Sequence, residues 1–383
     1  MSNEQSALIA SPAVHTRTTV AIAMSGGVDS SVAAALLLEQ GFDVVGLTMH
    51  LWTDEKGEEM SLNRASGCCS ITMAQDARAV ADKLGFKHYV LNLSREFHGA
   101  VVENFAGEYL RGRTPNPCVR CNTFVKWQTL LEKARKLGCE YLATGHYARV
   151  ERGAGRAVLR RALFPEKDQS YALWGLSQFS LNHTLFPLGE LAKSEVRELA
   201  RKYDLATAEK PESQDICFVP DNNYRRFLAD NYSSQLTVLG TGEFIGPDGR
   251  VLGRHDGIAH YTVGQRKGLG LSAGKPLYVK RIDPATDRVY LDFDENLGET
   301  SAYGVDANWV SIAEPVGLIE CAVKVRYRSE PIAARVTPRA GNEVRIEFGE
   351  AVRAITPGQS AVFYRDDVVL GGAILQATEG AER

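Results

Sequence analysis

The sequence predicts an α/β protein with an N-terminal doubly wound parallel sheet, a small central β-rich domain and a C-terminal β-barrel. Up to about residue 220, continuously apolar runs alternate with helix-like runs, which is typical of a parallel sheet covered by helices on both faces. Beyond that point, short alternating segments are separated by glycine turns, which indicates antiparallel strands. A length of 383 residues allows two or three domains. We expect a loose tail over 1–16 and domains over 17–221, 222–297 and 298–383.

The first half of the chain supplies the alternating elements. Apolar and β-branched residues predict a strand over 18–24, and a helix-like run follows over 31–40. RGRTPNPCVRCN (111–122) is predicted to be a loop because of its prolines. The remaining predicted elements are a strand over 43–49, a polar loop over 53–67, a helix over 71–85, a strand over 88–93, helices over 97–110 and 124–138, and a strand over 141–146.

The second half carries hairpin signals. Asp-Gly at 248–249 and Asp-Asp at 366–367 stand between strand-like runs. KVRYR (324–328) alternates Lys324, Arg326 and Arg328, which predicts one basic strand face. Such a face suits phosphate binding, although a solvated strand face is the alternative.

The composition is that of a globular protein, with 44% hydrophobic and 24% charged residues. No apolar stretch approaches the roughly 18 residues of a membrane span, and the first residues lack the pattern of a secretory signal, so we expect a cytoplasmic protein without membrane contact. A net charge of −3 means that any contact with nucleic acid must come from local basic patches.

The odd number of cysteines argues against a structural disulfide framework in a cytoplasmic chain. The thiols are therefore expected to be buried, reactive or metal-bound. We expect Cys68 and Cys69 to pack at a helix start, and Cys139 and Cys321 to lie in the core. The seven cysteines are Cys68, Cys69, Cys118, Cys121, Cys139, Cys217 and Cys321.

SGGVDS (25–30) lies between the first predicted strand and the first predicted helix. Glycines let the backbone approach a phosphate, and N–H groups at a helix start attract an anion. Asp29 is suited to hold a divalent cation among phosphate oxygens. A capped turn is the alternative for a lone S-G-G, but the full motif favours a phosphate site. No GxxxxGK[ST] occurs, so this is not a Walker loop.

This motif resembles the pyrophosphate loop of ATP pyrophosphatases with an adenine nucleotide alpha hydrolase-like fold, which cleave ATP to AMP and pyrophosphate. Further motifs, taken in order over about residues 18–375, resemble the tRNA-specific 2-thiouridylase family. That family replaces O2 of the wobble uridine by sulfur in tRNAs for Glu, Gln and Lys. The motifs are GRTPNPCVRCN (112–122), ATGHYAR (143–149), KDQSYAL (167–173), KPESQDICFV (210–219), YTVGQRKGLG (261–270) and KVRYR (324–328).

The resemblance implies a catalytic first domain that binds ATP with Mg²⁺, and a tRNA-binding barrel. Ligands of doubly wound sheets bind at the carboxyl ends of the strands, where the matching positions fall. The ATP-binding residues that it implies are Ala23, Met24, Ser25, Gly26, Gly27, Val28, Asp29, Ser30, Met49 and Gly145.

Thiolation of uracil needs both activation and a sulfur nucleophile. The carbonyl oxygen is a poor leaving group, so ATP must first convert it into an adenylate that a thiolate-type nucleophile can displace. In the simplest scheme a second thiol then releases the sulfur by forming a disulfide. The resemblance implies that Cys217 carries the persulfide and that Cys121 is its disulfide-forming partner. The alternative is a pair of buried structural cysteines.

One position departs from the family. The familiar loop reads P-N-P-Asp-x-x-Cys, and its Asp is taken as an acid/base group, whereas this chain has Cys118 there. Four arrangements stay open: the persulfide–disulfide route with Cys118 as a third thiol, an unused thiol, a zinc or redox pair with Cys121, and a [4Fe-4S] cluster held by Cys118, Cys121 and Cys217. Related tRNA thiolases with a three-cysteine site resemble the last of these.

The resemblance also implies contacts with RNA. A target base must leave its stack to reach a buried site. Asn116, Pro117 and Cys118 match the stretch that meets this base. The positions that match tRNA contacts are His146, Lys167, Asp168, Gln169, Arg326, Tyr327 and Gln359.

We therefore predict an ATP-dependent sulfurtransferase that converts the wobble uridine of tRNA to 2-thiouridine. The sulfur must come from a persulfide donor, such as a cysteine desulfurase or a sulfur-relay protein, because the chain shows no desulfurase or rhodanese signature. Two other classes stay open: an amide-forming ATP pyrophosphatase that acts on a small molecule, and a non-catalytic RNA-binding protein with a relic nucleotide loop.

Overall fold

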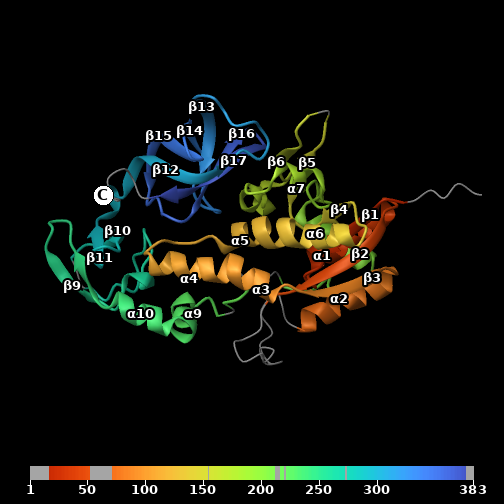
Figure 1. The fold of residues 1–383 in the computed structure, drawn as a ribbon, viewed down its shortest axis with the longest axis horizontal. Helices are drawn as coiled ribbons and strands as arrows, with labels where there is room; N and C mark the ends of the chain where they lie inside the picture. The colour runs from red at the N-terminus through yellow and green to blue at the C-terminus, as the bar shows by residue number, and fades with distance from the viewer. Residues whose placement is uncertain are drawn as a thin grey trace, which may run out of the picture.

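The computed structural model shows a parallel sheet at one side of the molecule, a β-barrel at the other and a smaller domain beside the barrel (Figure 1). The predicted tail over 1–16, the predicted loop over 53–67, and Cys68 and Cys69 lie outside the described residues. The structure describes residues 17–51, 71–153, 155–211, 216–219, 221–271 and 274–376.

The parallel sheet has β1 (Thr19–Ala23) at its centre, in the strand order β3-β2-β1-β4-β7. Val20, Ala21 and Ile22 are fully buried, as expected for a strand that is covered on both faces. All the pairings within this sheet are parallel, which confirms the predicted sheet. The other strands are β2 (Asp43–His50), β3 (Lys87–Asn92), β4 (Tyr141–Ala143) and β7 (Thr184–Leu185).

Helices cover both faces of the sheet. Val20 and Ile22 pack in the hydrophobic cluster that contains α1 (Val28–Glu39), α2 (Ile71–Leu84) and α8 (Lys193–Lys202). Ala21 packs in the opposite cluster, because successive side chains of a strand point to opposite faces. Two composite helices cover that face: α3 (Ser94–Phe97), η1 (His98–Val102) and α4 (Glu103–Leu110), followed by α5 (Pro117–Arg120), η2 (Cys121–Leu130) and α6 (Leu131–Lys136).

The predicted loop over 111–122 is wrong in its second half, because a helix begins at Pro117. Oδ1 of Asn116 accepts a hydrogen bond from the N–H of Val119 at 3.3 Å and so caps this helix. A proline at the first helical position costs no hydrogen bond, since its N–H would have no partner there. Cys118 and Cys121 consequently lie in the first turns of a helix.

The middle part of the chain begins with two helices, so the prediction of β structure directly after residue 222 is wrong for its first segment. Phe227 on α9 packs edge-on against Phe105 on α4, with ring centroids 5.9 Å apart, and this apolar contact explains the helix. The strands follow in the order β10-β11-β8-β9, with the predicted Asp-Gly turn between β8 and β9. The elements are α9 (Tyr224–Asn231), α10 (Ser233–Leu239), β8 (Gly242–Ile245), β9 (Val251–His255), β10 (Tyr278–Asp283) and β11 (Arg288–Asp292).

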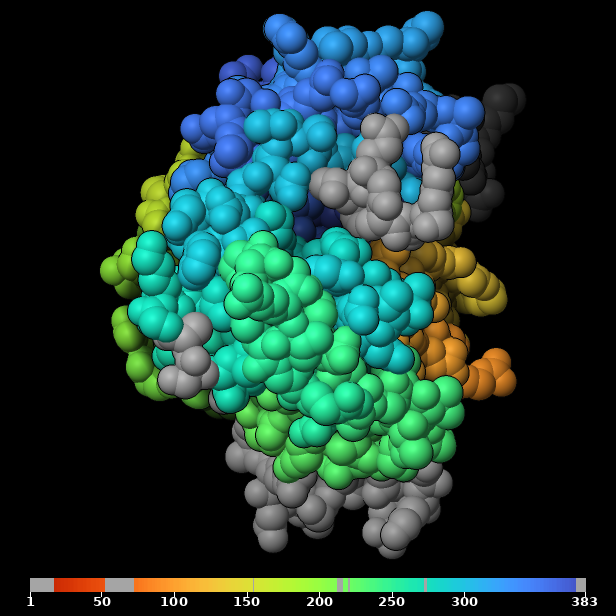
Figure 2. Space-filling view, turned by 90° about the vertical axis from the view of Figure 1, so that its left-hand side faces the viewer, coloured from red at the N-terminus to blue at the C-terminus, as the bar shows by residue number. Residues whose placement is uncertain are grey.

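The C-terminal strands form a closed barrel, as predicted, in the order β12-β15-β14-β13-β16-β17 with β17 paired back to β12. Figure 2 shows this barrel, in blue, above the middle domain, in green to cyan. A hairpin of the first domain, β5 and β6, extends the sheet through the pair Val368 and Arg160. The strands are β5 (Ala148–Glu151), β6 (Val158–Arg161), β12 (Gly298–Asn308), β13 (Ile319–Lys324), β14 (Ile332–Arg339), β15 (Glu343–Arg353), β16 (Ser360–Arg365) and β17 (Val368–Gln376).

The prediction that 324–328 forms one strand face is wrong, because β13 ends at Lys324. The N–H of Arg326 donates to Oγ of Ser329 at 3.2 Å instead of to a neighbouring strand, so the chain turns here. The remaining helical segments are η3 (Pro165–Lys167), η4 (Ser170–Leu173), α7 (Gln178–Asn182), η5 (Ile258–His260) and η6 (Asp294–Asn296). None of the described helices is long and apolar enough to cross a membrane.

Candidate functional site

The loop between β1 and α1 is folded tightly onto the first turn of the helix. The backbone N–H of Ser25 donates to Oγ of Ser30 at 3.3 Å, and the hydroxyl of Ser30 donates to the carbonyl oxygen of Gly27 at 3.1 Å. Gly26 has a φ of +69°, and a Cβ there would lie 2.4 Å from the carbonyl oxygen of Met73. Only glycine fits this position without strain. The predicted phosphate-binding residues from Ala23 to Ser30 thus form one compact loop at the carboxyl end of β1.

Asp29, in the first turn of α1, is held by two groups from distant parts of the chain. Nζ of Lys193 lies 2.6 Å from Oδ1 and 2.8 Å from Oδ2 of Asp29. The hydroxyl of Tyr147 donates to Oδ1 at 2.7 Å. The motif SGGVDS identifies Asp29, but nothing in the sequence indicates Lys193 or Tyr147 as its partners.

Gly145 and Met49 lie where neighbouring strands of the sheet end. A Cβ on Gly145 would lie 2.8 Å from the backbone nitrogen of Ser30 and 2.9 Å from the carbonyl carbon of Asp29. Gly145 therefore permits the loop after β4 to approach the start of α1, at the point where the strand order reverses. Met49, near the end of β2, is half-buried beside the hydrophobic cluster.

Lys210 connects the phosphate loop with the motif that contains Cys217. Its Nζ donates to the carbonyl oxygen of Gly26 at 3.2 Å and forms an ion pair with Asp76 on α2. Because Lys210 is the first residue of KPESQDICFV, the segment that leads to Cys217 starts at the phosphate loop.

Cys121 and Cys217 pack against the same hydrophobic cluster, and the residue next to each contacts the composite helix 94–110. Phe218, next to Cys217, packs edge-on against Phe105, with ring centroids 5.0 Å apart. Nε of Arg120, next to Cys121, donates to the carbonyl oxygen of Ala100 at 2.7 Å. The two motif segments, 96 positions apart in the sequence, are thus anchored on nearby turns of one helix.

Cys118 is exposed, whereas Cys121 and Cys217 are partly buried. Among the described residues, no group of three or more His, Cys, Asp or Glu side chains is placed to hold a metal ion. Cys118, in α5, and Cys121, the first residue of η2, lie one helical turn apart.

The barrel contacts the loop that leads to Cys118. The side-chain amide of Gln359 donates to the carbonyl oxygens of Thr114 and Pro115, at 3.1 Å and 3.0 Å. The N–H of Thr114 in turn donates to the carbonyl oxygen of Pro357 at 2.8 Å. The predicted tRNA contact Gln359 therefore lies against the predicted base-binding stretch.

Arg326 supports this contact from within the barrel. Its guanidinium donates to Oγ1 of Thr356, at 2.9 Å, and to the carbonyl oxygen of Ala354. Burial lowers the pKa of this guanidinium from its ordinary value, and the positive charge of Arg353 lowers it further. Arg326 thus holds the turn that carries Gln359.

The segment 167–169 connects the barrel with the phosphate loop. The hydroxyl of Tyr327 donates to the carbonyl oxygen of Asp168 at 3.3 Å, while Oε1 of Gln169 accepts the N–H of Tyr147 at 3.0 Å. The Asp168 side chain is only 3% exposed and accepts hydrogen bonds from Ser170 and Ala162. Asp168 therefore shapes this segment from inside. Lys167 ends η3, next to it.

His146 belongs to the loop after β4, and its ring lies beside Trp127 of η2. Its Nδ1 is 2.7 Å from Oγ1 of Thr144, and its ring centroid is 5.6 Å from that of Trp127. Burial lowers its pKa well below the ordinary value, and the nearby charge of Lys126 lowers it further. The imidazole is therefore neutral near pH 7.

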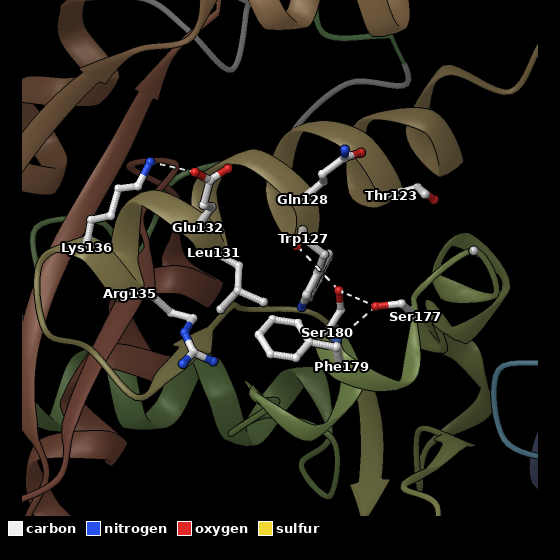
Figure 3. A pocket seen from close by; sticks show the side chains of 11 residues that line it. Thr123, Trp127, Gln128, Leu131, Glu132, Arg135, Lys136, Ser177, Phe179 and Ser180 are labelled. Atoms are coloured by element: carbon white, nitrogen blue, oxygen red, sulfur yellow. Dashed lines mark hydrogen bonds and ion pairs between the residues drawn. The ribbon is translucent and has the colours of Figure 1, made fainter.

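A cavity of about 600 Å³ lies between η2, α6 and α7 (Figure 3). Phe179 and Ser180 face Trp127 across it, and Arg135 lies 5.0 Å from the ring centroid of Phe179. None of the predicted site residues lines this cavity. A smaller one, of about 270 Å³, is lined by Asn116 together with Gly358 of the barrel, so it adjoins the predicted base-binding stretch.

Three family models match the chain. Residues 18–221 match the tRNA methyl transferase HUP domain, residues 226–292 match the tRNA methyl transferase PRC-barrel domain, and residues 300–375 match the aminomethyltransferase beta-barrel domain. The first match alone spans more than half of the chain.

Curated relatives are similar over nearly their whole length. The tRNA-specific 2-thiouridylase MnmA of Clostridium perfringens is 45% identical, over 94% of this chain and 99% of the relative. The protein of the same name from Carboxydothermus hydrogenoformans is 49% identical, over 94% of this chain and 98% of the relative. Among solved structures, a 4-thiouridine synthetase in complex with RNA and ATP is similar over 58% of this chain and 52% of its own, with 15% identity and a TM-score of 0.34.

Proposed function

The chain belongs to the tRNA-specific 2-thiouridylase family, and from this premise we propose how its residues perform the reaction. It is a tRNA sulfurtransferase that uses ATP to convert uridine to 2-thiouridine. The observation that carries this conclusion is identity of 45% and 49% with such enzymes over 94% of the chain. It is tested by nucleoside mass spectrometry of tRNA, in which 2-thiouridine must appear only when ATP is supplied.

The first step is activation of the uracil of the wobble nucleotide in tRNAs for Glu, Gln and Lys. Its O2 attacks the α-phosphorus of ATP, the bond to the β-phosphate oxygen breaks, and pyrophosphate leaves with the electron pair. The N–H groups at the start of α1 support this step, because no side chain caps them and they can donate to phosphate oxygens. Met49 and Gly145 lie at the neighbouring strand ends, where an adenosine would bind.

Mg²⁺ would be held by Asp29 together with phosphate oxygens of ATP. One carboxylate at the phosphate loop fits this cation, which binds through one or two carboxylates plus substrate phosphates. Bound there, it supplies positive charge to the phosphates. Asp29 is kept oriented toward the loop by the hydroxyl of Tyr147, at 2.7 Å.

The second step transfers sulfur. A persulfide on Cys217 attacks C2 of the adenylated uracil, and AMP leaves with the former O2. The thiolate of Cys121 then attacks Sγ of Cys217, so that a Cys121–Cys217 disulfide forms and the outer sulfur stays on C2 with the electron pair. An external thiol must reduce the disulfide before the next cycle. The shared anchoring of both segments on helix 94–110 supports this pairing.

The tRNA would be held by both β-rich domains and by the motif loops of the first domain. Asn116, Pro117 and Cys118 are proposed to meet the target base, because they lie at a helix start beside the smaller cavity. Lys167, Tyr327, Arg326, Gln169 and His146 are proposed to lie along the RNA path, and Asp168 and Gln359 to position the loops that they contact.

We propose the persulfide route over a [4Fe-4S] cluster because Cys121 and Cys217 pack against one hydrophobic cluster, whereas Cys118 is exposed. Iron and acid-labile sulfide, measured on protein purified without oxygen, test this choice beside a Cys118→Ala variant. Active protein without iron, and an active variant, support the persulfide route. Stoichiometric iron that disappears together with thiolation in the variant contradicts it.

We propose domain boundaries at 17–221, 222–297 and 298–383, with 1–16 as a tail. A cysteine desulfurase or sulfur-relay protein is proposed as the persulfide donor. A cytoplasmic location is proposed for the chain.

A further inference from the structure

Lys193 is the first residue of α8, far along the chain from the phosphate loop that it contacts. Its Nζ lies 2.6 Å and 2.8 Å from the two carboxylate oxygens of Asp29. The Lys193 side chain is 14% exposed and that of Asp29 is 33% exposed. The ammonium group is therefore held within the structure at the start of α1, where phosphates are expected.

A second donor to Asp29 makes this ion pair exchangeable. The hydroxyl of Tyr147 binds Oδ1 of Asp29 at 2.7 Å, and the backbone N–H of Tyr147 is itself held by Oε1 of Gln169. Asp29 would keep a hydrogen-bond donor and its orientation if Lys193 turned away. Lys193 has four carbons of flexible stem and needs only rotamer changes to reach a neighbouring anion.

The negative charge of bound ATP would attract the ammonium group of Lys193 away from Asp29. ATP brings several negative charges to a loop whose helix start supplies only about half an elementary charge. Among the described residues, Lys193 and Lys210 are the cations bonded to positions 24–30, and Lys210 is engaged with Asp76 and with the carbonyl oxygen of Gly26. When Lys193 exchanges Asp29 for phosphate oxygens, its own charge stays compensated. The Asp29 side chain, which is 33% exposed, keeps the hydroxyl of Tyr147 and its contact with solvent.

We propose that Lys193 is a phosphate-binding residue of the ATP site. Asp29 holds its ammonium group beside the loop before ATP binds, and the ammonium group moves to the phosphate oxygens of ATP when the nucleotide binds. Asp29, still held by Tyr147, is thereby released for a divalent cation. This inference rests on the proposed use of ATP, and it assigns the binding of the triphosphate group to a residue outside the motif.

The test compares ATP with adenosine, which lacks the phosphates, by isothermal titration calorimetry of the full chain in EDTA. Lys193→Met keeps most of the aliphatic stem and removes the charge. We expect the Kd of ATP to rise about 10- to 100-fold, as for the loss of a hydrogen bond between charged groups. The Kd of adenosine should change by less than about threefold, since adenosine has no group for Lys193 to bind.

Two further variants keep the result interpretable. Lys202→Met, at the other end of α8, removes an exposed lysine that lies 3.8 Å from Glu39 and should leave both affinities unchanged. Lys193→Gln is neutral but can still donate a hydrogen bond to Asp29, so it should weaken ATP binding as much as Lys193→Met does. It serves as the test if Lys193→Met fails to fold. Unchanged ATP affinity, or equal weakening of ATP and adenosine, in the folded Lys193 variants would overturn the inference.

Failure of the inference and failure of the proposed function give different results. A wild-type chain that binds ATP but forms no 2-thiouridine contradicts the proposed function and leaves the role of Lys193 standing. A wild-type chain that thiolates tRNA, while Lys193→Met binds ATP normally, contradicts only the role of Lys193.

Discussion

Gln359 of the C-terminal barrel donates a hydrogen bond to the carbonyl oxygen of Pro115 in the first domain, at 3.0 Å. Pro115 is three positions before Cys118 and six before Cys121. The position of the helix that carries these thiols consequently depends on a residue of the barrel. A tRNA that moves the barrel turn would also move this loop.

Replacing Gln359 tests this connection. Gln359→Ala removes two hydrogen bonds to backbone carbonyls, and we expect kcat/KM for tRNA thiolation to fall about tenfold. Gln359→Glu should be more severe, because it places carboxylate oxygens against the carbonyl oxygens of Thr114 and Pro115. ATP affinity serves as the control, since neither change touches the phosphate loop. Equal activity of both variants and wild type would show that the contact is unimportant.

Cys217→Ser should abolish 2-thiouridine formation but leave tRNA-dependent release of pyrophosphate from ATP, because the thiol acts after activation of the base. Nucleoside mass spectrometry measures 2-thiouridine, and an assay for pyrophosphate measures the activation step. Cys321→Ser is the matched control, since Cys321 lies on β13 in the barrel, where burial raises the pKa of its thiol to about 12. Normal thiolation by Cys217→Ser would exclude the persulfide role.

Gly26→Ala and Gly27→Ala form a second matched pair. A Cβ at Gly26 would clash with the backbone of Met73, and its φ of +69° disfavours alanine, so the free energy of unfolding should fall by about 1–3 kcal/mol. Gly27 has a φ of −95°, and the nearest atom to an added Cβ is 3.5 Å away. Its substitution should cost only about a few tenths of a kcal/mol to 1 kcal/mol. Urea denaturation measures both, and equal losses would contradict this account of the loop.

Arg326→Ala should weaken tRNA binding, because the turn that carries Gln359 loses the guanidinium that holds Thr356 and Ala354. If the same guanidinium also reaches a phosphate, the slope of log K against log salt concentration should fall by about one. Arg201→Ala, which removes an exposed arginine paired with Glu209 at the end of α8, is the control. Unchanged affinity together with an unchanged slope would rule out a role for Arg326 in binding.

His146 should make the stability of the folded chain depend on pH. Its pKa in the folded state is well below that in the unfolded state, which is about 6.5. The unfolded chain therefore binds more protons as the pH falls, and stability is lost from about pH 7 to about pH 5. His146→Gln should lose less stability over that interval, as measured by urea midpoints. An equal loss in both proteins would mean that His146 takes up its proton in the folded state.

Patterns that act over short distances made much of the fold predictable. The parallel strands and most helices follow from apolar periodicity, and the turns at 248–249 and 366–367 from their Asp-Gly and Asp-Asp pairs. The helix at Pro117 was missed because proline was taken only as a breaker, whereas the cap by Asn116 makes it a helix start. The helix α9 was missed because its packing surface, Phe105, lies in another domain.

The site was predictable in its motifs but not in its contacts. SGGVDS identifies Asp29, yet nothing local relates Asp29 to Lys193, which is 164 positions away. Tyr147 belongs to the motif ATGHYAR, but the contact of its hydroxyl with Asp29 depends on the order of the strands. The contact of Gln359 with Pro115 was equally unpredictable from the sequence, because it joins two domains.

The most direct test of the account follows both products of the reaction in one experiment. The chain is incubated with ATP, Mg²⁺, unmodified tRNA and a persulfide donor, and 2-thiouridine and AMP are measured over time. The account predicts that 2-thiouridine and AMP form in equal amounts and that the 2-thiouridine lies at the wobble position of the tRNA. Without tRNA, neither product should form above background. Thiolation without ATP, formation of ADP in place of AMP, or transfer of a methyl group from S-adenosylmethionine to the tRNA would contradict it.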